Sequence, residues 1–318
     1  MRNAFIRGLT ALADRDDRVV LLTGDLGFKI FDNFAQRFPG RFINAGVAEA
    51  NMVGVAAGMA MDGLRPFAYS ITPFATLRCF EQIRNDVCYH NLPVTIVGVG
   101  GGYAYGPNGP THHAMEDIAV MRTLPNLTVV CPGDPVEAEV SVLRIGEQNG
   151  PVYLRLGRAG DAVVHREAPE FRIGSAITLE AGSDCVLIST GGILSVAMEA
   201  AGLLRAASIG ARVVNMHTVK PLDSEMLAEC CQEGVPVFTI EEHGQAGGLG
   251  SAIGEWLSEH RLSCRLNSIA CGDRFAHRSG SQNYLRAQEG LTAAQVAERV
   301  SSVLEAGRSA AATSDRVD

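Results

Sequence analysis

The stretch RFINAGVAEANMVGVAAGMAMDG, residues 41–63, places a short apolar strand, a glycine-containing turn and an apolar helix in direct succession. This order is typical of parallel sheets, because two parallel strands are joined by a crossover that is usually a helix. The same alternation continues along almost the whole chain. The expected strands are RVVLLTGD, RFINAG, RPFAYS, LPVTIVGVG, LTVVCPG and PVYLRLG, followed by DCVLIST, ARVVNMHTV, PVFTIEEH and NSIACG. The sequence therefore predicts an α/β fold with parallel or mixed sheets.

The alternation is interrupted at residues 158–174 by a charged, proline-containing stretch, RAGDAVVHREAPEFRIG. We therefore predict two α/β domains, at residues 1–165 and 166–308. The final helix is expected to begin at Thr292 and Gln295, which have the spacing of a capping box. Residues 309–318 are small and polar, and we expect them to form a disordered tail.

The composition excludes several classes of protein. The 318 residues carry a formal net charge of −8, with 27 basic residues scattered among 35 acidic ones, so nucleic acid is not an expected partner. No apolar stretch reaches the roughly 18–20 residues of a membrane span, and no signal peptide is recognisable, so we expect a cytoplasmic protein without a membrane partner. The eight cysteines form no CxxC pair and are expected to be reduced and mostly buried. No metal site built by this chain alone is predicted, because the adjacent His112 and His113 cannot both face one ion from a regular element.

Polar residues gather at the ends of the expected strands, where open α/β sheets hold their binding sites. The sharpest candidate is Glu49, whose carboxylate stands at the start of the apolar helix within residues 41–63. Taken alone, this feature favours the simpler alternative, a first-turn acid that stabilises the helix dipole. The other polar segments are TGDLG (23–27), the glycine-rich loop GVGGGYAYGPNGPTHHAMED (98–117), TVKPLD (218–223) and EEHGQAGGLG (241–250).

In their order and spacing, these segments resemble the C-terminal portion of transketolases and 1-deoxyxylulose-5-phosphate synthases, over residues from about 20 to about 290. The resemblance implies a thiamine-diphosphate enzyme, with a pyrimidine-binding domain followed by a transketolase C-terminal domain. TVKPLD and the cluster Glu241-Glu242-His243 fall in the second domain, for which the resemblance implies a structural role in shaping the dimer.

The resemblance assigns cofactor contacts to four residues. Glu49, within GVAE, matches the carboxylate that hydrogen-bonds N1′ of the aminopyrimidine, where proton sharing activates the cofactor. Phe74 matches the aromatic residue that stacks on the pyrimidine, and Phe80 is a further candidate with core packing as the alternative. Asp25 falls at the acidic position after the first strand, where it helps to hold the cofactor site, with capping of a turn as the alternative.

Other residues are implied on the substrate side. His112, within GPTH, matches the catalytic histidine near the reacting carbon. Arg158, within RLGR, matches the arginine that grips a substrate phosphate, with a surface role as the alternative. His113 and Asn108 are further substrate-binding candidates, and packing or capping of the next helix is the alternative for His113. The loop departs from the family at Gly100, in place of a histidine, and at Asn108, in place of an acidic residue, which implies an unusual donor or acceptor sugar.

The family holds the diphosphate and Mg²⁺ with a G-D-G motif in an N-terminal domain, and no G-D-G occurs in this sequence. The resemblance therefore implies a split transketolase. This chain would pair with a separate N-terminal diphosphate-binding subunit as an α2β2 heterotetramer, with the Mg²⁺ ligands on the partner. The implied reaction transfers a two-carbon ketol unit between sugar substrates.

Two alternatives stay open at this point. One is a decarboxylating thiamine-diphosphate enzyme, similar to 1-deoxyxylulose-5-phosphate synthase or to the β subunit of a 2-oxoacid dehydrogenase. The other is a non-catalytic partner that only completes a complex. The motif GPTHH (109–113) favours the sugar enzymes, and the retained Glu49 and His112 argue against a non-catalytic role.

Overall fold

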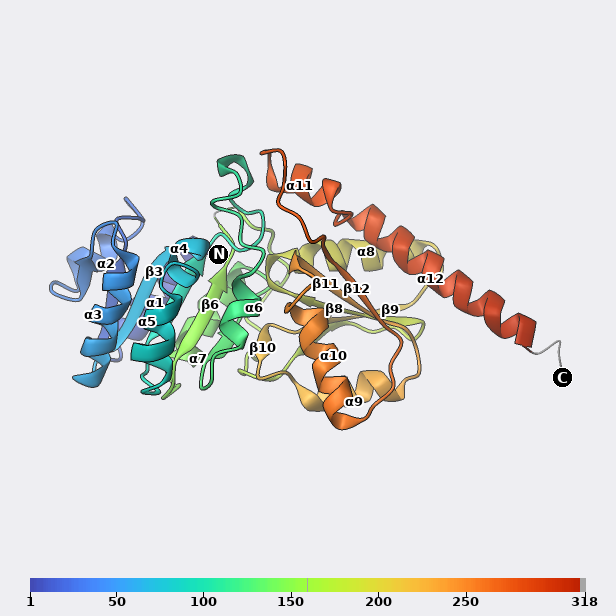
Figure 1. The fold of residues 1–318 in the computed structure, drawn as a ribbon, viewed down its shortest axis with the longest axis horizontal. Coiled ribbons are helices and arrows are strands. Elements are labelled where there is room, and N and C mark those ends of the chain that lie inside the picture. Colours follow the sequence, from blue (N-terminus) through green and yellow to red (C-terminus); the bar gives the residue numbers. More distant parts are fainter. Residues whose placement is uncertain (159, 315–318) are drawn as a thin grey trace.

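The computed structural model describes residues 1–158 and 160–314, with side chains over 1–158 and 160–308. The chain forms two α/β units, drawn in blue to green and in yellow to red in Figure 1. The predicted fold class, two α/β domains with parallel or mixed sheets, is confirmed. None of the helices in the described part of the chain has the length and apolar character needed to cross a bilayer.

The first sheet has seven strands in the order β10-β5-β6-β4-β3-β1-β2. Six of them run parallel and come from the first half of the chain: β1 (Val19–Thr23), β2 (Phe42–Asn44), β3 (Arg65–Ile71), β4 (Thr95–Val99), β5 (Thr128–Val130) and β6 (Val152–Leu156). All six coincide with segments that the sequence predicts as strands, and β3 extends one residue beyond the predicted segment, to Ile71. Their almost continuous apolar runs fit a sheet that is covered on both faces.

The seventh strand, β10 (Thr218–Lys220), comes from the second half of the chain and pairs antiparallel with β5. The ammonium group of Lys220 donates hydrogen bonds to the carbonyl groups of Arg122 and Leu124, at 3.0 and 2.5 Å. Sequence reasoning places this segment in the second domain and does not foresee the pairing, because a strand of three residues carries no periodic signal.

Helices cover both faces of the first sheet. They are α1 (Arg2–Ala13), α2 (Asp32–Arg37), α3 (Glu49–Met61), α4 (Thr72–Thr76), α5 (Phe80–Gln82), the π-helical turn η1 (Ile83–Cys88), the 3-10 turn η2 (Gly106–Asn108), α6 (Asp117–Arg122) and α7 (Pro135–Ile145). Helices α3 and α4 follow β2 and β3 closely, and both strands flank β1. Residues at the starts of these helices therefore meet at one edge of the sheet.

The second sheet has five strands in the order β12-β11-β8-β9-β7. Strands β8 (Cys185–Thr190), β9 (Ala211–Asn215), β11 (Val237–Gly244) and β12 (Leu266–Cys271) are parallel, and β7 (Ile177–Glu180) is antiparallel to β9. The sequence predicts the four parallel strands but not β7, a partly buried edge strand. The helices of this unit are η3 (Gly191–Ile193), α8 (Leu194–Ala206), α9 (Ser224–Gln232), α10 (Leu249–His260), α11 (Gln282–Gln288) and α12 (Ala293–Ser314).

Helix α12 begins with the expected capping box. The Thr292 N–H donates to Gln295 Oε1 and the Gln295 N–H donates to Thr292 Oγ1, both at 3.3 Å. The helix runs to Ser314, into the segment for which we expect a disordered tail, and residues 315–318 lie outside the described residues. The eight cysteines are free thiols, and six of them are buried.

Candidate active site

Glu49 lies at the first position of α3, at the edge where β1, β2 and β3 end side by side. Its side chain is only 2% exposed. Ser70, in β3, donates a hydrogen bond to Glu49 Oε1 at 3.2 Å, and Arg78 Nη1 donates to Glu49 Oε2 at 2.6 Å. A Cβ at Gly24 would lie 3.1 Å from Glu49 Cγ, so this glycine makes room for the carboxylate. The buried carboxylate is therefore held by one hydroxyl and one cation.

Arg78 is a residue that sequence reasoning missed, although the structure places it at the centre of the site. Its guanidinium carbon lies 4.5 Å from the centroid of the Phe74 ring, and its side chain is 47% exposed. Phe74 and Arg78 are four residues apart, a spacing that puts two side chains on the same face of a helical turn. That spacing is the signal from which the pair could have been inferred.

His112 extends this cluster from the glycine-rich loop. Its ring lies edge-on to Phe74, with 5.2 Å between the centroids, and its Nδ1 is 3.0 Å from Thr111 Oγ1. Burial and, to a smaller extent, the charge of His113 hold the pKa of His112 below its usual value, so the ring is neutral at pH 7. Phe74 thus contacts both His112 and Arg78, and Arg78 in turn contacts Glu49.

Asp25 shapes the turn that precedes α3. It has a positive φ of 59° and exchanges two hydrogen bonds with Asn44, one from its own N–H at 3.1 Å and one from Asn44 Nδ2 at 2.9 Å. Asn44 Oδ1 also accepts a hydrogen bond from the N–H of Gly46, so the pair fixes the backbone that leads into Glu49. Phe80, the first residue of α5, is partly buried and packs against the apolar core that includes the inner face of α3.

The loop directs its two histidines differently. His113 is 6% exposed, its Nε2 lies 3.1 Å from the carbonyl oxygen of Gly106, and its ring lies edge-on to Tyr103 at 5.0 Å. These are contacts of a residue that packs inside the loop, whereas His112 faces Phe74. Asn108 is exposed at the end of η2.

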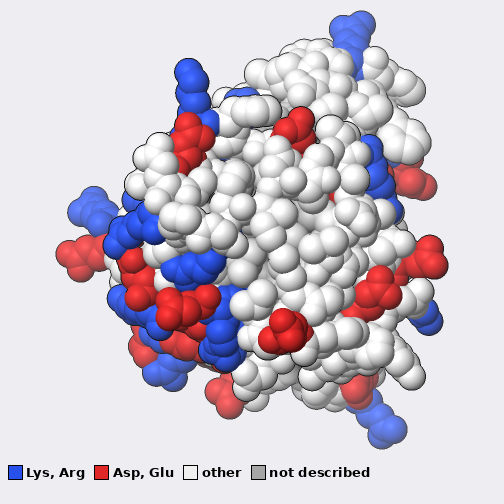
Figure 2. Space-filling view, turned by 90° about the vertical axis from the view of Figure 1, so that its left-hand side faces the viewer, with Lys and Arg blue, Asp and Glu red and all other residues white. Residues whose placement is uncertain are grey.

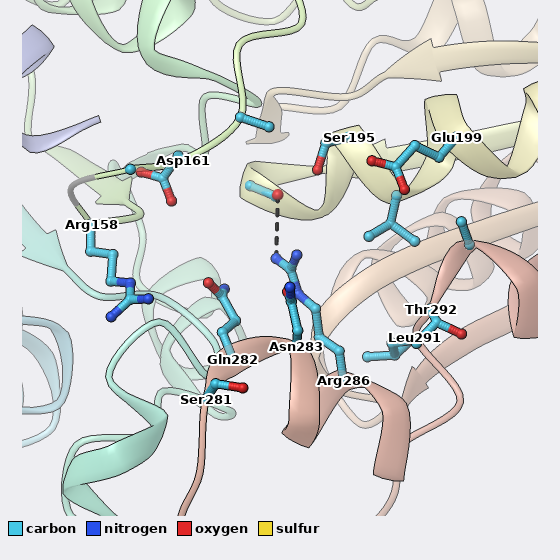
Figure 3. Close-up of a pocket in the computed structure, with 15 residues that line it drawn as sticks. Arg158, Asp161, Ser195, Glu199, Ser281, Gln282, Asn283, Arg286, Leu291 and Thr292 are labelled. Carbon is cyan, nitrogen blue, oxygen red and sulfur yellow. Dashed lines mark hydrogen bonds between the residues drawn. The ribbon is translucent and has the colours of Figure 1, made fainter.

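Arg158 lines a cleft of about 470 Å³ between the two units (Figure 3). Ser195, from the first turn of α8, and Gln282 and Arg286, from α11, line the same cleft. Arg286 Nη2 donates a hydrogen bond to the carbonyl group of Gly192 at 3.3 Å, which is the dashed line in Figure 3. The guanidinium of Arg158 therefore faces residues of the second unit that sequence reasoning did not assign to the site.

Arg158 also lies within electrostatic reach of the glycine-rich loop. Burial raises the pKa of Tyr105, and the nearby charges of Arg2 and Arg158 oppose that rise. The ring of Tyr105 is in turn 6.5 Å from the ring of His112. Tyr105 is therefore near both His112 and Arg158.

Buried charges join the two units behind this loop. Arg155 Nε donates to Asp117 Oδ2 at 2.7 Å, and the hydroxyl of Tyr153 donates to the same oxygen at 2.6 Å. Burial would raise the pKa of Asp117, but the charge of Arg155 holds it below its usual value. Arg155 Nη2 also donates to the carbonyl group of Glu242, at 3.1 Å, and so links the first sheet to β11.

The side chain of Glu242 fastens the glycine-rich loop to the second unit. Its carboxylate accepts hydrogen bonds from the N–H of Tyr103 at 2.9 Å and from Arg286 Nη2 at 2.6 Å, and it also accepts from Gln282 Nε2. The neighbouring Glu241 accepts from the backbone N–H groups of Leu249 and Gly250 at the start of α10. Glu242 therefore acts on the loop that carries His112, a contact that motif reading alone does not reveal.

Each of the two units matches a known protein family. The family described as "Transketolase, pyrimidine binding domain" matches residues 1–160, and "Transketolase, C-terminal domain" matches residues 174–296. The "6-deoxy-6-sulfo-D-fructose transketolase subunit" of a Clostridium species is 38% identical over 96% of this chain and 94% of its own length. An apulose-4-phosphate transketolase subunit of Phocaeicola vulgatus is 37% identical over 84% of this chain and 86% of its own length.

Solved structures show the same relationship. A split-gene transketolase described as an inactive β4 tetramer has a TM-score of 0.88 and 38% identity, and the match covers 96% of this chain and 98% of that one. Among the sequence relatives, the 1-deoxy-D-xylulose-5-phosphate synthase of Heliobacterium modesticaldum is 35% identical over 95% of this chain, but this chain spans only 47% of that enzyme.

Proposed function

This chain belongs to the transketolase family, and on that basis we propose that it is the pyrimidine-binding subunit of a split, thiamine-diphosphate-dependent transketolase. The reaction moves a two-carbon ketol unit from a ketose to an aldose. The observation that carries the proposal is the cluster of Glu49, Phe74 and His112, which combines a buried carboxylate, an aromatic face and a neutral imidazole at one sheet edge. Each group fits one task in that reaction.

The residues present fit the pyrimidine ring of the cofactor. A planar group with N–H donors, the guanidinium of Arg78, already lies against Phe74 and donates to Glu49. A planar aminopyrimidine offers the same two features, so Glu49 would hold a proton at N1′ and Phe74 would stack on the ring. When bound, the cofactor supplies the electron sink that carbon–carbon cleavage needs. Asp25 supports this site indirectly, through the turn before Glu49.

His112 suits proton transfer to or from a substrate hydroxyl. Because its pKa is lowered by burial, the neutral ring offers an acceptor nitrogen at pH 7. Its position next to Phe74 puts it on the face of the site where a substrate would meet the cofactor. Arg158 provides a planar fork of donors for a terminal anionic group.

The substrates are sugars that differ from the common ketose phosphates. The names of the two relatives above describe a sugar with a sulfo group and a sugar with a phosphate. A single Arg158 guanidinium can bind either group, because both present oxygen acceptors to a bidentate donor. Gly100 and Asn108 stand where the resemblance implies a histidine and an acidic residue, which favours a different pattern of hydroxyl groups near the reacting carbons.

The partner we propose is an N-terminal diphosphate-binding subunit in an α2β2 assembly. Helix α3 supports this, because it is apolar on its outer face as well as its inner one, with Val55 38% and Met61 58% exposed, and Val47 just before it is 75% exposed. Figure 2 looks onto the end of the molecule where α2 and α3 lie and shows a broad central area with few charged side chains. An apolar face of this kind is typical of a protein interface.

We place the Mg²⁺ ligands on the partner subunit as well. The implied diphosphate site depends on a G-D-G motif that this sequence lacks. In the part of the chain that the structure describes, no group of three or more His, Cys, Asp or Glu side chains is arranged to hold a metal ion.

Calorimetric titration with thiamine diphosphate and Mg²⁺ tests the split site. We expect weak or undetectable binding to this subunit alone and tight, Mg²⁺-dependent binding once the partner is added, because an unneutralised diphosphate would otherwise face water. Omission of Mg²⁺ is the control. Tight binding to the isolated subunit would contradict the proposal.

The substrate assay separates the alternatives. A decarboxylating enzyme similar to the 1-deoxy-D-xylulose-5-phosphate synthases would release carbon dioxide from pyruvate, and a transketolase would instead exchange two-carbon units between sugars. A non-catalytic subunit would leave the reconstituted pair without thiamine-dependent turnover of either kind.

A further inference from the structure

We propose that Arg78 is a positioning residue that occupies the pyrimidine site of the free subunit and must leave it when the cofactor binds. This inference rests on the proposed function. Arg78 donates a hydrogen bond to Glu49 and stacks on Phe74. The pyrimidine ring would make the same two contacts in the assembled enzyme. The free subunit therefore carries its own stand-in for the cofactor ring.

The geometry of the guanidinium carries this step. One edge of the group donates from Nη1 to Glu49 Oε2 at 2.6 Å, and one face of the same group lies 4.5 Å from the centroid of Phe74. A planar group that satisfies an acceptor with its edge and an aromatic ring with its face fills the space for a second planar group with the same needs. Arg78 and the pyrimidine are therefore mutually exclusive at this position.

The burial of Glu49 explains why the free subunit needs such a residue. The carboxylate is 2% exposed, and apart from Arg78 its hydrogen-bond donor among the described residues is the neutral hydroxyl of Ser70. An ionised carboxylate buried without a cation is strongly destabilising. Arg78 stabilises the empty site by supplying that cation.

Arg78 is also able to leave. Its side chain is 47% exposed while Glu49 is buried, so the arginine reaches inward from the surface. Among the described residues, its guanidinium has hydrogen bonds to Glu49 and to no other side chain. Rotation of its long side chain into solvent breaks one ion pair and one stacking contact. The pyrimidine would replace the stacking contact, and the proton shared between Glu49 and N1′ would take the place of the arginine cation.

The consequence is a competition that lowers cofactor affinity. If the inward conformer dominates, only the minor population with Arg78 turned outward can accept the pyrimidine, and the apparent affinity falls by that fraction. Removal of Arg78 should therefore destabilise the empty subunit and, in the assembled complex, tighten cofactor binding. If Arg78 merely supported the site, its removal would lower both the stability of the empty subunit and the affinity of the complex for the cofactor.

The test compares Arg78→Met with a matched control, Arg84→Met, which removes an exposed arginine from the adjacent η1 turn. We expect R78M to lower the thermal unfolding midpoint of the free subunit and to tighten thiamine diphosphate binding by the reconstituted complex by about 10-fold, measured by calorimetry. R84M should change neither. Arg78→Lys, which keeps the charge but not the plane, should keep most of the stability and give a smaller gain in affinity.

A double variant isolates the pair. In a Glu49→Gln background the buried group is neutral, so R78M should lower the unfolding midpoint of the free subunit much less than it does in the native background. Equal or weaker cofactor binding by R78M, or an undiminished loss of stability in the Gln background, would overturn the inference.

Should R78M not fold, R78K carries the same test. If the native complex itself binds no thiamine diphosphate, the proposed function fails instead, which separates the two conclusions.

Discussion

The ring of Tyr105 fills the space that a side chain at Gly100 would need. A Cβ at Gly100 would lie 2.2 Å from Tyr105 Cδ2 and 2.3 Å from its Cε2, and Gly100 has a φ of 93°. The position at which the resemblance implies a histidine is therefore closed to any side chain while Tyr105 keeps its place. The aromatic ring, 6.5 Å from His112, stands there instead. The departure at Gly100 is thus paired with a compensating residue in the same loop.

Gly100→Ala should destabilise the protein and impair activity. The positive φ alone costs about 1–2 kcal/mol for a residue with a Cβ, and the clash with Tyr105 adds to that cost. Gly63→Ala is the matched control, because Gly63 has a φ of 89° with no atom within 4 Å of the added Cβ. Urea unfolding of both variants isolates the clash as the difference in free energy. Addition of Tyr105→Ala to Gly100→Ala should recover part of that difference, and a failure to do so would show that the ring is not the obstacle.

Glu49→Gln should slow activation of the cofactor in the assembled enzyme by at least ~10²-fold, because the amide is a poor proton partner for N1′. The measurement is deuterium exchange at C2 of the thiazolium, followed by NMR. Assembly, checked by size-exclusion chromatography, should survive, since Gln keeps the shape of Glu. An unchanged exchange rate would reduce Glu49 to a helix-end residue.

Arg158→Ala should raise KM for a substrate with a terminal phosphate or sulfonate by about 10–100-fold, the scale of one or two charge-assisted hydrogen bonds. The KM of the unphosphorylated analogue should change much less. Arg166→Ala, which removes an exposed arginine from the connection between the domains, is the control. Equal effects on both substrates would place Arg158 outside the substrate path.

Glu242→Gln should lower the free energy of unfolding by about 3–5 kcal/mol, because it leaves the buried Arg286 without a counter-charge. Hydrogen exchange at the amide of Tyr103, which donates to Glu242, should rise at the same time. Glu255→Gln is the control, since its ion pair with Arg122 involves a glutamate that is 64% exposed and is worth about 0–1 kcal/mol. Protection of the Tyr103 amide equal to that of the native protein would argue against the proposed anchoring of the loop.

The protein should lose stability as the pH falls from 7.5 to 5. Burial lowers the pKa of His217 and of His243 to about 4, so between that value and their unfolded pKa of about 6.5 the unfolded chain binds more protons than the folded one. The loss is about 2 kcal/mol per histidine at pH 5.

Two groups oppose this trend. Burial would lower the pKa of His165, but the hydrogen bond to Glu137 together with the charges of Glu137 and Asp134 raises it. Burial raises the pKa of Glu241 to about 7, so the net loss of stability is smaller than the sum of the two histidine contributions. Urea midpoints measured across this range should fall less in His217→Gln, and an equal fall in that variant would exclude His217 as a source.

Features that depend on neighbouring residues could be predicted without coordinates. The alternation of strands and helices, the capping box at Thr292 and Gln295, and the placement of Glu49 at a helix start all follow from local periodicity and turn chemistry. The change at Gly100 was also visible, because a loop motif is read residue by residue. For such features, the physical cause lies within a few positions of the residue itself.

The meeting of distant groups depends instead on the packing of the whole chain. Arg78 approaches Glu49 across 29 positions, and the Tyr103 amide approaches Glu242 across 139. Strand β10 crosses to the sheet of the other unit and pairs with β5. This pairing depends on the order of the strands in the sheet and not on the residues of β10. Such contacts are set by how crossovers stack the strands and by the burial of charges that need a partner. No local pattern encodes either, so the ion pair at the centre of the site became visible only in three dimensions.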